Sequence, residues 1–122
     1  AAFSGQDNIP AISELVQPDI CAAGNMLSKP DVIAAVVQGY VSSNASFARR
    51  LLAGLIAGAQ RGGDARGLMS AALLILAPDQ PPINLRIDFA DAPLRSLEDL
   101  IIRTEAEDYA AWRRALPTRA SP

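Results

Sequence analysis

The chain has 122 residues, of which half are hydrophobic and a fifth are charged; this composition is typical of one globular domain and excludes a disordered or fibrous chain. Its net charge of −2 comes from acidic and basic residues mixed along the sequence, without the block of like charge that binds nucleic acid or an anionic membrane. The longest apolar run, residues 71–77, is far shorter than the roughly 20 residues that cross a bilayer, and no basic-then-apolar leader opens the chain, so we expect a soluble, cytoplasmic protein.

The first predicted elements are two short strands. Residues 1–6 suit a strand that runs into a turn, and residues 20–23 form a second short apolar run. This second run ends at Gly24-Asn25, a turn dipeptide that tolerates unusual backbone angles.

Two helices are expected next. Ser28, with Pro30 and an acidic residue behind it, indicates a helix start, and apolar residues then recur every three or four positions as far as residue 41. A second amphipathic helix follows residues 42–44. Gly62-Gly63 ends this helix, because glycine readily adopts left-handed backbone angles.

The second half of the sequence predicts a strand pair and a last helix. Residues 70–76 show no polar alternation, which is typical of a strand covered on both faces. After a proline-rich break, residues 85–89 alternate between apolar and polar side chains, as in an antiparallel neighbour covered on one face. A helix is expected from residue 91 to about residue 116. Because helices and strands are grouped rather than alternating, the order predicts an α+β fold.

Cysteine and histidine usage limits the chemistry that the chain can perform. Cys21 is the only cysteine, so an internal disulfide and a cysteine-rich zinc site are excluded. Histidine is absent, which removes Ser-His-Asp and Cys-His catalytic sets and His-ligated metals. We expect no metal and no cofactor. Cys21 lies among small apolar residues without a neighbouring base, which favours buried packing over a role as nucleophile.

Four segments in order carry a resemblance to a known family: AAFSG, CAAGNML, RRLLAGLIAGAQRGGDARGLMSAALLIL and NLRIDF. Over about residues 1–97 the chain resembles the C-terminal half of the bacterial proteins known as domain of unknown function 1028, which are assigned to the Ntn (N-terminal nucleophile) hydrolase-like class. The resemblance implies a four-layer αββα sandwich, in which helices cover two stacked antiparallel sheets. It also implies an amidohydrolase that acts on a small amide or amino-acid derivative.

The resemblance further implies that residues 1–116 form the C-terminal half of one Ntn-hydrolase-like domain, followed by a loose tail at residues 117–122. The sequence itself supports this idea, because it opens inside a predicted strand and the strand at residues 70–76 requires cover on both faces. We expect the N-terminal half to be a separate chain in a homo- or hetero-oligomer that binds a small-molecule substrate, and no nucleic acid or membrane.

The catalytic nucleophile is expected outside this chain. In the Ntn mechanism the α-amine of the first residue acts as the base, and its own Thr, Ser or Cys side chain attacks the carbonyl group. Ala1 cannot do this. The nucleophile is therefore expected in the missing half of the domain.

The strongest candidates for substrate binding lie at residues 63–70. The resemblance matches five of them in order: Gly63, Asp64, Arg66, Gly67 and Ser70. It implies that Arg66 presents its fork of donors to a substrate carboxylate, while Asp64 orients Arg66 or accepts from the substrate's amine. The alternative is that Asp64 stabilises the turn and Arg66 pairs with it at the surface. Met69 stands where family members often carry a polar residue such as Gln, which implies an altered substrate preference or lost activity.

Asn25 is the candidate for catalysis within the chain. It follows a strand end, where Ntn-type enzymes often place oxyanion or substrate donors, and such an amide donor contributes on the order of 3 kcal/mol. The alternative is a turn residue chosen for its backbone tolerance. The resemblance therefore implies a subunit or fragment of an Ntn-type amidohydrolase. A non-catalytic assembly or binding subunit of the same fold is the alternative, and a free-standing regulatory domain would need a core that closes without a partner.

Overall fold

The computed structural model describes residues 5–8 and 11–118, which form two compact units, Ala1–Leu68 and Met69–Pro122. The described residues contain four helices and two antiparallel sheets of two strands each, so the predicted α+β class is confirmed. Residues 1–4 of the expected first strand lie outside the described residues, and residues 6–8 form a turn and a bend.

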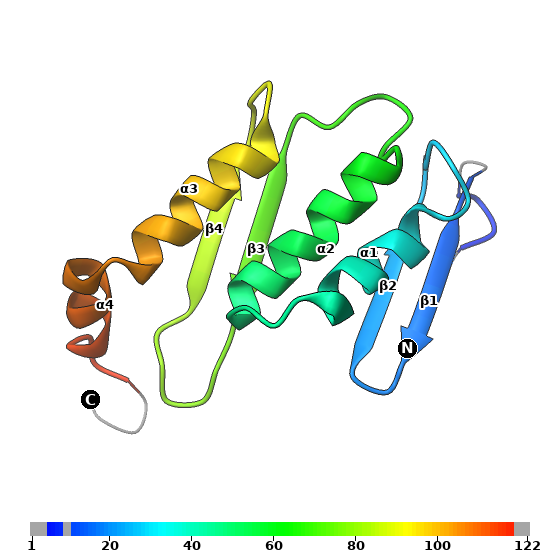
Figure 1. Cartoon of the computed structure of the whole chain (residues 1–122). Helices are drawn as coiled ribbons and strands as arrows, with labels where there is room; N and C mark the ends of the chain where they lie inside the picture. The colour runs from blue at the N-terminus through cyan, green and yellow to red at the C-terminus, as the bar shows by residue number, and fades with distance from the viewer. Residues whose placement is uncertain (1–4, 9–10, 119–122) are drawn as a thin grey trace. The chain divides into compact units, whose positions relative to one another are not determined.

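The first unit begins with a hairpin that the sequence analysis only half predicted. β1 (Ser13–Gln17) pairs antiparallel with β2 (Ile20–Gly24), and Val16 lies opposite Cys21 (Figure 1). Side chains alternate along both strands, and Val16 and Cys21 are exposed on the outer face. The expected burial of Cys21 is therefore wrong, because strand alternation places it on the face opposite to the core.

One helix covers the inner face of this hairpin, and a second helix packs against the first. α1 (Val32–Ser42) packs on the hairpin and α2 (Phe47–Arg61) packs beside α1 (Figure 1). Three buried residues and two partly buried ones form the core of the contact between α1 and the hairpin: Leu27, Val32, Ile33, Leu15 and Ala22. The predicted positions of both helices are confirmed, but Ser28 does not cap α1. Asp31 occupies the N-cap without a side-chain cap bond and instead pairs with Arg61 at the end of α2.

Glycines allow α1 and α2 to approach closely. A Cβ atom added to Gly39 would lie 2.6 Å from the Ala57 Cβ and 2.8 Å from the Ala53 carbonyl oxygen, so even a methyl group has no room there. Gly54 and Gly58 meet α1 from the other helix in the same way. The two helices therefore pack backbone against backbone, and a larger side chain at one of these glycines would push them apart.

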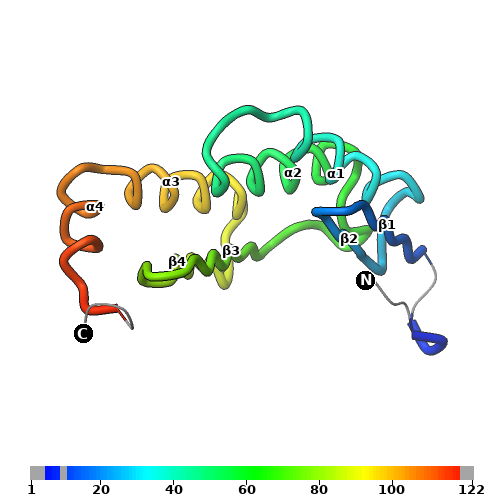
Figure 2. The backbone as a smooth tube through the Cα atoms, turned by 90° about the horizontal axis from the view of Figure 1, so that it is seen from below, coloured from blue at the N-terminus to red at the C-terminus, as the bar shows by residue number. Residues whose placement is uncertain are grey.

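The second unit is a hairpin covered by one helix. β3 (Ala71–Ile75) pairs antiparallel with β4 (Ile83–Ile87), and α3 (Pro93–Glu105) lies on one face of the pair (Figure 2). Leu97 and Ile101 of α3 are fully buried, as is most of Leu73 from β3. The antiparallel pairing and the one-sided cover of β4 were predicted correctly. Among the described residues β3 is covered on one face and its outward side chains are exposed, so the expected cover on the second face stays a prediction.

The last predicted helix is divided in two. α3 ends at Glu105, Ala106 has extended dihedral angles (φ −63°, ψ 136°), and α4 (Glu107–Arg114) begins directly after it. Arg103 donates two hydrogen bonds of 2.9 Å to Asp108 across the break, and the buried Thr104 hydroxyl donates to the Ile101 carbonyl. Side-chain bonds to nearby groups of this kind compete with a continuous helix. Polar contacts therefore stabilise the break, and the spacing of apolar residues in the sequence does not predict such contacts.

The close approach at Gly39 predicts that alanine at this position destabilises the fold. At an open helical position Gly→Ala stabilises by about 1 kcal/mol. For Gly39→Ala we instead expect the free energy of unfolding to fall by about 1–3 kcal/mol, because the methyl group overpacks the contact with α2. Urea denaturation measures this, and the exposed neighbour substitution Gln38→Ala should stay within about 0.5 kcal/mol of the wild type. A more stable Gly39→Ala protein would contradict the close packing.

The outward position of Cys21 predicts its reactivity. In the folded chain Cys21 should react with Ellman's reagent to one equivalent per chain, without denaturant, because its side chain is exposed. In the matched measurement the chain is unfolded in urea. The number of thiols that react per chain should then be nearly the same as in the folded protein. A thiol that reacts only after unfolding would contradict the alternation assigned to β2.

Candidate functional site

Two loops of the first unit are joined by backbone hydrogen bonds. The segment after β2 meets the segment after α2 through a bridge between Leu27 and Asp64. The Ser28 N–H donates to the Gly63 carbonyl (2.9 Å), and the Ala65 N–H donates to the Met26 carbonyl (2.8 Å). We call residues 25–28 and 63–66, held together in this way, the loop pair. The contact places the loop that begins at Asn25 beside the loop that contains Asp64 and Arg66. The sequence alone does not indicate that these two loops meet.

Left-handed backbone angles shape the loop pair. Gly62 (φ 135°) ends α2 and Gly63 (φ 59°) turns the chain toward the other loop, as predicted from the glycine pair. On the facing loop the left-handed residue is Met26 (φ 53°), rather than Gly24 or Asn25. A positive φ is uncommon for a long side chain and costs conformational energy that the surrounding structure must offset. The two hydrogen bonds between the loops supply part of that compensation.

Asp64 and Arg66 contact each other through three hydrogen bonds. The Arg66 backbone N–H donates to Asp64 Oδ1 (2.8 Å), Nε donates to the same oxygen (2.9 Å), and Nη2 donates to Oδ2 (2.7 Å). The first closes a local turn and the other two form a bidentate ion pair. The pairing that the sequence analysis gave as the structural alternative is therefore present. It also holds Arg66 in one orientation, which is the first part of the functional interpretation.

These contacts change the acidity of both groups. Hydrogen bonds from the Arg66 side chain, followed by the bond from its backbone N–H, lower the pKa of Asp64 from 3.8 to about 2. The same pairing raises the pKa of Arg66. Asp64 therefore carries its negative charge at every pH at which an enzyme normally works, and it acts as a hydrogen-bond acceptor rather than as a general acid.

Exposure differs between the two partners. The Asp64 side chain is 24% exposed, whereas that of Arg66 is 67% exposed. The contacts to Asp64 use Nε and one N–H of Nη2, so the edge formed by Nη1 and Nη2 can still donate two parallel hydrogen bonds. Arg66 thus offers solvent a donor edge of fixed orientation.

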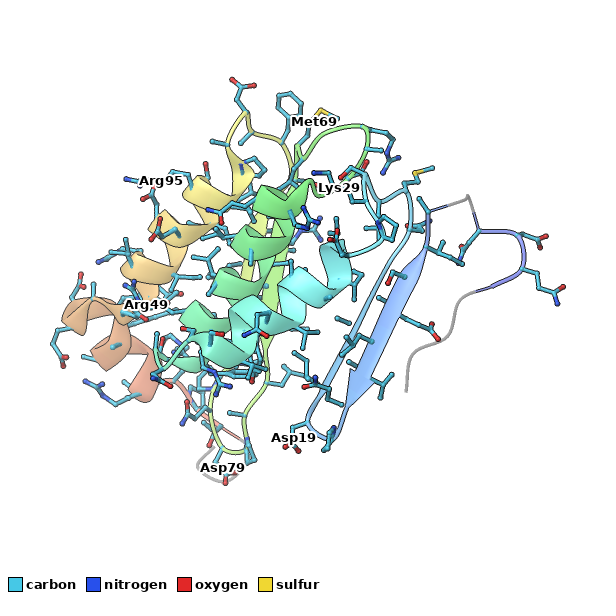
Figure 3. All side chains as sticks on the ribbon, turned by 45° about the vertical axis from the view of Figure 1, so that its right-hand side comes forward. Asp19, Lys29, Arg49, Met69, Asp79 and Arg95 are labelled. Carbon is cyan, nitrogen blue, oxygen red and sulfur yellow. The ribbon has the colours of Figure 1, made fainter. Side chains whose placement is uncertain are left out.

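The remaining predicted site residues divide between the two units. Asn25 is exposed and begins the first loop of the pair, directly after β2. Ser70 is exposed just before β3 and belongs to the second unit, so its assignment to substrate binding stays a prediction. Sequence reasoning missed Lys29, which follows the loop pair ahead of α1 and whose side chain lies near Gly62 (Figure 3).

A concave region of the second unit contains none of these residues. It lies between the β3–β4 connection and α4, where Arg113 Nη2 donates to the Pro81 carbonyl (2.8 Å). Seven residues line it: Asp79, Gln80, Pro81, Ala110, Arg113, Arg114 and Thr118. Within residues 5–8 and 11–118, no three Cys, Asp or Glu side chains gather as a metal site would require, and no helix has the length and apolar character to cross a membrane.

Comparison with known families agrees with this fold. The model of a family described as "Family of unknown function (DUF1028)" matches residues 1–97. The chain belongs to the DUF1028 family. A crystal structure of a DUF1028 protein from Silicibacter pomeroyi is 39% identical in sequence and superposes with a TM-score of 0.90. The match covers 99% of this chain but 54% of the S. pomeroyi chain, so the chain spans about half the length of that relative. No curated protein sequence matches it.

The hydrogen bonds to Asp64 predict its titration. Because its pKa in the folded chain is lowered, Asp64 stabilises the fold above pH 4, and this stabilisation is lost as the pH falls from 3.8 toward 2. A carboxyl-detected NMR titration should place its midpoint at about 2. In Arg66→Ala the midpoint should move part of the way toward 3.8, since the backbone N–H of residue 66 still donates. A wild-type midpoint near 3.8 would contradict the bidentate pair.

Proposed function

We propose that this DUF1028 chain is one part of an Ntn-type amidohydrolase that acts on a small amide or amino-acid derivative. In this proposal the chain supplies the C-terminal half of an αββα sandwich, and the N-terminal half, a separate polypeptide, supplies the nucleophile. Arg66 binds the anionic end of the substrate, Asp64 holds Arg66 in place, and Asn25 donates a hydrogen bond to the oxyanion that forms during attack.

The observation that carries the proposal is the exposed donor edge of Arg66, oriented by Asp64, in a loop whose backbone is bonded to the loop that begins at Asn25. A substrate carboxylate fits the Nη1–Nη2 edge through two parallel hydrogen bonds. Because Asp64 already orients the guanidinium, binding costs less side-chain entropy than it would for a mobile arginine. The ionised Asp64 also balances the charge of Arg66, so the site favours a substrate with both an anionic and a polar or cationic group, such as an N-acyl amino acid.

The proposed reaction divides the work between the two polypeptides. The partner's Thr, Ser or Cys side chain forms a bond to the amide carbonyl carbon, and its own α-amine takes the proton. The C–N bond then breaks, and the departing nitrogen receives that proton. Water hydrolyses the resulting ester or thioester and regenerates the nucleophile. The chain described here contributes substrate binding through Arg66 and stabilisation of the negative oxygen through Asn25.

The length of the family relative supports a further half of the domain beyond the residues matched here. Nearly half of the S. pomeroyi chain lies outside the match. That remaining polypeptide is long enough to contribute further strands and a nucleophile. Residues 5–8 and 11–118 include no histidine that could activate a serine or cysteine, so a nucleophile in the partner agrees with the composition of this chain.

The hydrogen bonds within the Asp64–Arg66 pair favour a second candidate function. Both carboxylate oxygens of Asp64 accept from Arg66, so the pair can serve purely to hold the turn. On this alternative the chain is a non-catalytic assembly or binding subunit of the same fold. The two functions differ in what Asn25 does, because a binding subunit needs no oxyanion donor.

Activity measurements on the complete native assembly test the proposal. We expect hydrolysis of a small N-acyl or N-carbamoyl amino acid from a panel of such compounds. Asn25→Ala should lower kcat by about 10²- to 10³-fold, as loss of an oxyanion donor does elsewhere. Arg66→Ala should raise KM, and Arg66→Lys should restore little, because a single ammonium group cannot form two parallel hydrogen bonds.

Arg95→Ala provides the matched control. Arg95 is an exposed arginine of α3 in the second unit with an acidic neighbour, Glu98, so its loss removes the same charge from a residue that is not part of the loop pair (Figure 3). Its kinetics should equal those of the wild type. An intact assembly that contains the nucleophile but hydrolyses none of the panel would overturn the enzyme proposal and leave the binding subunit.

A further inference from the structure

The concave region of the second unit has the size of a small-molecule site. Its volume is about 370 Å³, and ligand cavities in proteins start at about 300 Å³. The residues that line it come from the β3–β4 connection (79–81) and from α4 (110–114), together with Thr118. We call it the arginine cavity, because Arg113 and Arg114 both line it. It has no residue in common with the loop pair.

Arg113 carries a positive charge that forms no ion pair with a described carboxylate. Its Nη2 donates to the Pro81 carbonyl in the opposite wall (2.8 Å), and its Nε is buried without an acceptor among the described residues. Arg114, by contrast, pairs with Glu107 at 2.7 Å. Because a guanidinium that is partly removed from water is costly without an anionic partner, Arg113 favours an anion in the cavity. Nη1 and the second N–H of Nη2 remain as donors for it.

A role in capping α4 does not explain the position of the Arg113 side chain. Basic residues are favourable in the last turn of a helix, because the carbonyl groups there carry partial negative charge. In α4, however, backbone donors already bind these carbonyls. The Ala115 N–H donates to the carbonyls of Ala111 and Trp112, and the Leu116 N–H donates to that of residue 113. The helix end is therefore capped without the Arg113 side chain, which instead reaches the β3–β4 connection.

The wall formed by the β3–β4 connection has the opposite chemistry. Asp79, at the tip of the connection, lines the cavity together with Gln80, and Asp79 forms no ion pair with a described residue (Figure 3). Asp79 has a left-handed backbone (φ 58°), and strained residues of this kind cluster at binding sites. Three prolines restrict the same connection, at positions 78, 81 and 82. This wall therefore has a restricted shape and offers acceptors rather than donors.

The two walls suit a ligand that carries both charges. A carboxylate accepts parallel N–H groups from an arginine, and an ammonium group donates to a carboxylate such as that of Asp79. A phosphate group, with a charge of about −2 at pH 7, would bind Arg113 but would be repelled by Asp79. We propose that the arginine cavity binds a free α-amino acid, with its carboxylate on Arg113 and its ammonium group at Asp79.

This binding site does not depend on the proposed hydrolysis. The wall that contains Arg113 belongs to α4, which lies beyond residues 1–97, the part of the chain that the family model matches. The site also uses none of Asn25, Asp64 and Arg66. Its test therefore needs no activity measurement, and its failure would leave the proposed function as it stands.

An NMR titration of the complete native assembly locates the bound amino acid. The chain is labelled with ¹⁵N, and the probes are L-alanine, L-glutamine and L-phenylalanine, added separately up to about 10 mM. We expect the amide signals of residues 79–80 and 110–114 to shift in a saturable way with at least one probe. No saturable shift there with any probe would overturn the proposal. So would shifts confined to residues 63–66, because the amino acid would then bind at the loop pair.

Two variants test the contact in different ways. Arg113→Ala removes the cation and should weaken binding at least about tenfold. Ala110→Leu adds volume to the wall of the cavity without changing its charge, and it should also weaken binding. The matched control is Arg86→Ala, an exposed arginine of the same unit that does not line the cavity, which should change binding less than about twofold. Wild-type affinity in Arg113→Ala or in Ala110→Leu would overturn the proposal.

Partial ligands separate the two ends of the amino acid. Acetate carries only the carboxylate and methylammonium only the ammonium group, so each should bind at least about tenfold more weakly than the amino acid. In Asp79→Asn the preference for the amino acid over acetate should fall, because the ammonium group loses its charged partner. Acetate or inorganic phosphate that binds as tightly as the amino acid would show a site for simple anions and would overturn the assignment of the ligand.

Discussion

The backbone contact between residues 26–28 and 63–65 is the constraint on which the candidate site depends. It joins the end of the first hairpin to the end of α2, two positions separated by two complete helices in the sequence. Both sides reach this contact through left-handed residues, Met26 on one loop and the glycine pair on the other. Without the contact, Asn25 and Arg66 would lie on two independent loops, and neither would have a defined direction.

The second constraint is the local ion pair that the loop pair supports. Asp64 accepts three hydrogen bonds from Arg66 on its two carboxylate oxygens, which leaves Oδ2 with acceptor capacity for one further donor. It can orient Arg66, and it remains ionised because those same hydrogen bonds lower its pKa. The structure therefore shows Arg66 exposed to solvent and Asp64 facing Arg66.

The features predicted correctly from the sequence are those that local chemistry decides. Gly62-Gly63 ends α2 because only glycine adopts those angles at low cost, and the proline-rich break after β3 separates two strands that pair as neighbours. The features missed depend on non-local or side-chain contacts. The break at Ala106 is stabilised by Arg103 and Asp108, and the outward position of Cys21 depends on which face of β2 receives α1.

The cover expected on both faces of β3 shows a different limit of sequence reasoning. The pattern of AALLI is that of a strand buried on both sides, yet the chain itself covers one side. Hydrophobic patterning alone does not show which of the two faces the chain itself covers. The same reasoning does not identify the site, because Asn25, Asp64 and Arg66 have ordinary structural roles until the loop contact places them together.

The measurement that tests this account most directly is amide hydrogen exchange at the loop pair. The N–H groups of Ser28 and Ala65 donate the two bonds that join the loops. The account predicts that both are protected to the same extent and exchange together, as members of one cooperative unit with α1 and α2. Exchange of both at the rate of an unstructured peptide, while the helices remain protected, would show that the loops are separate and that no preformed site exists.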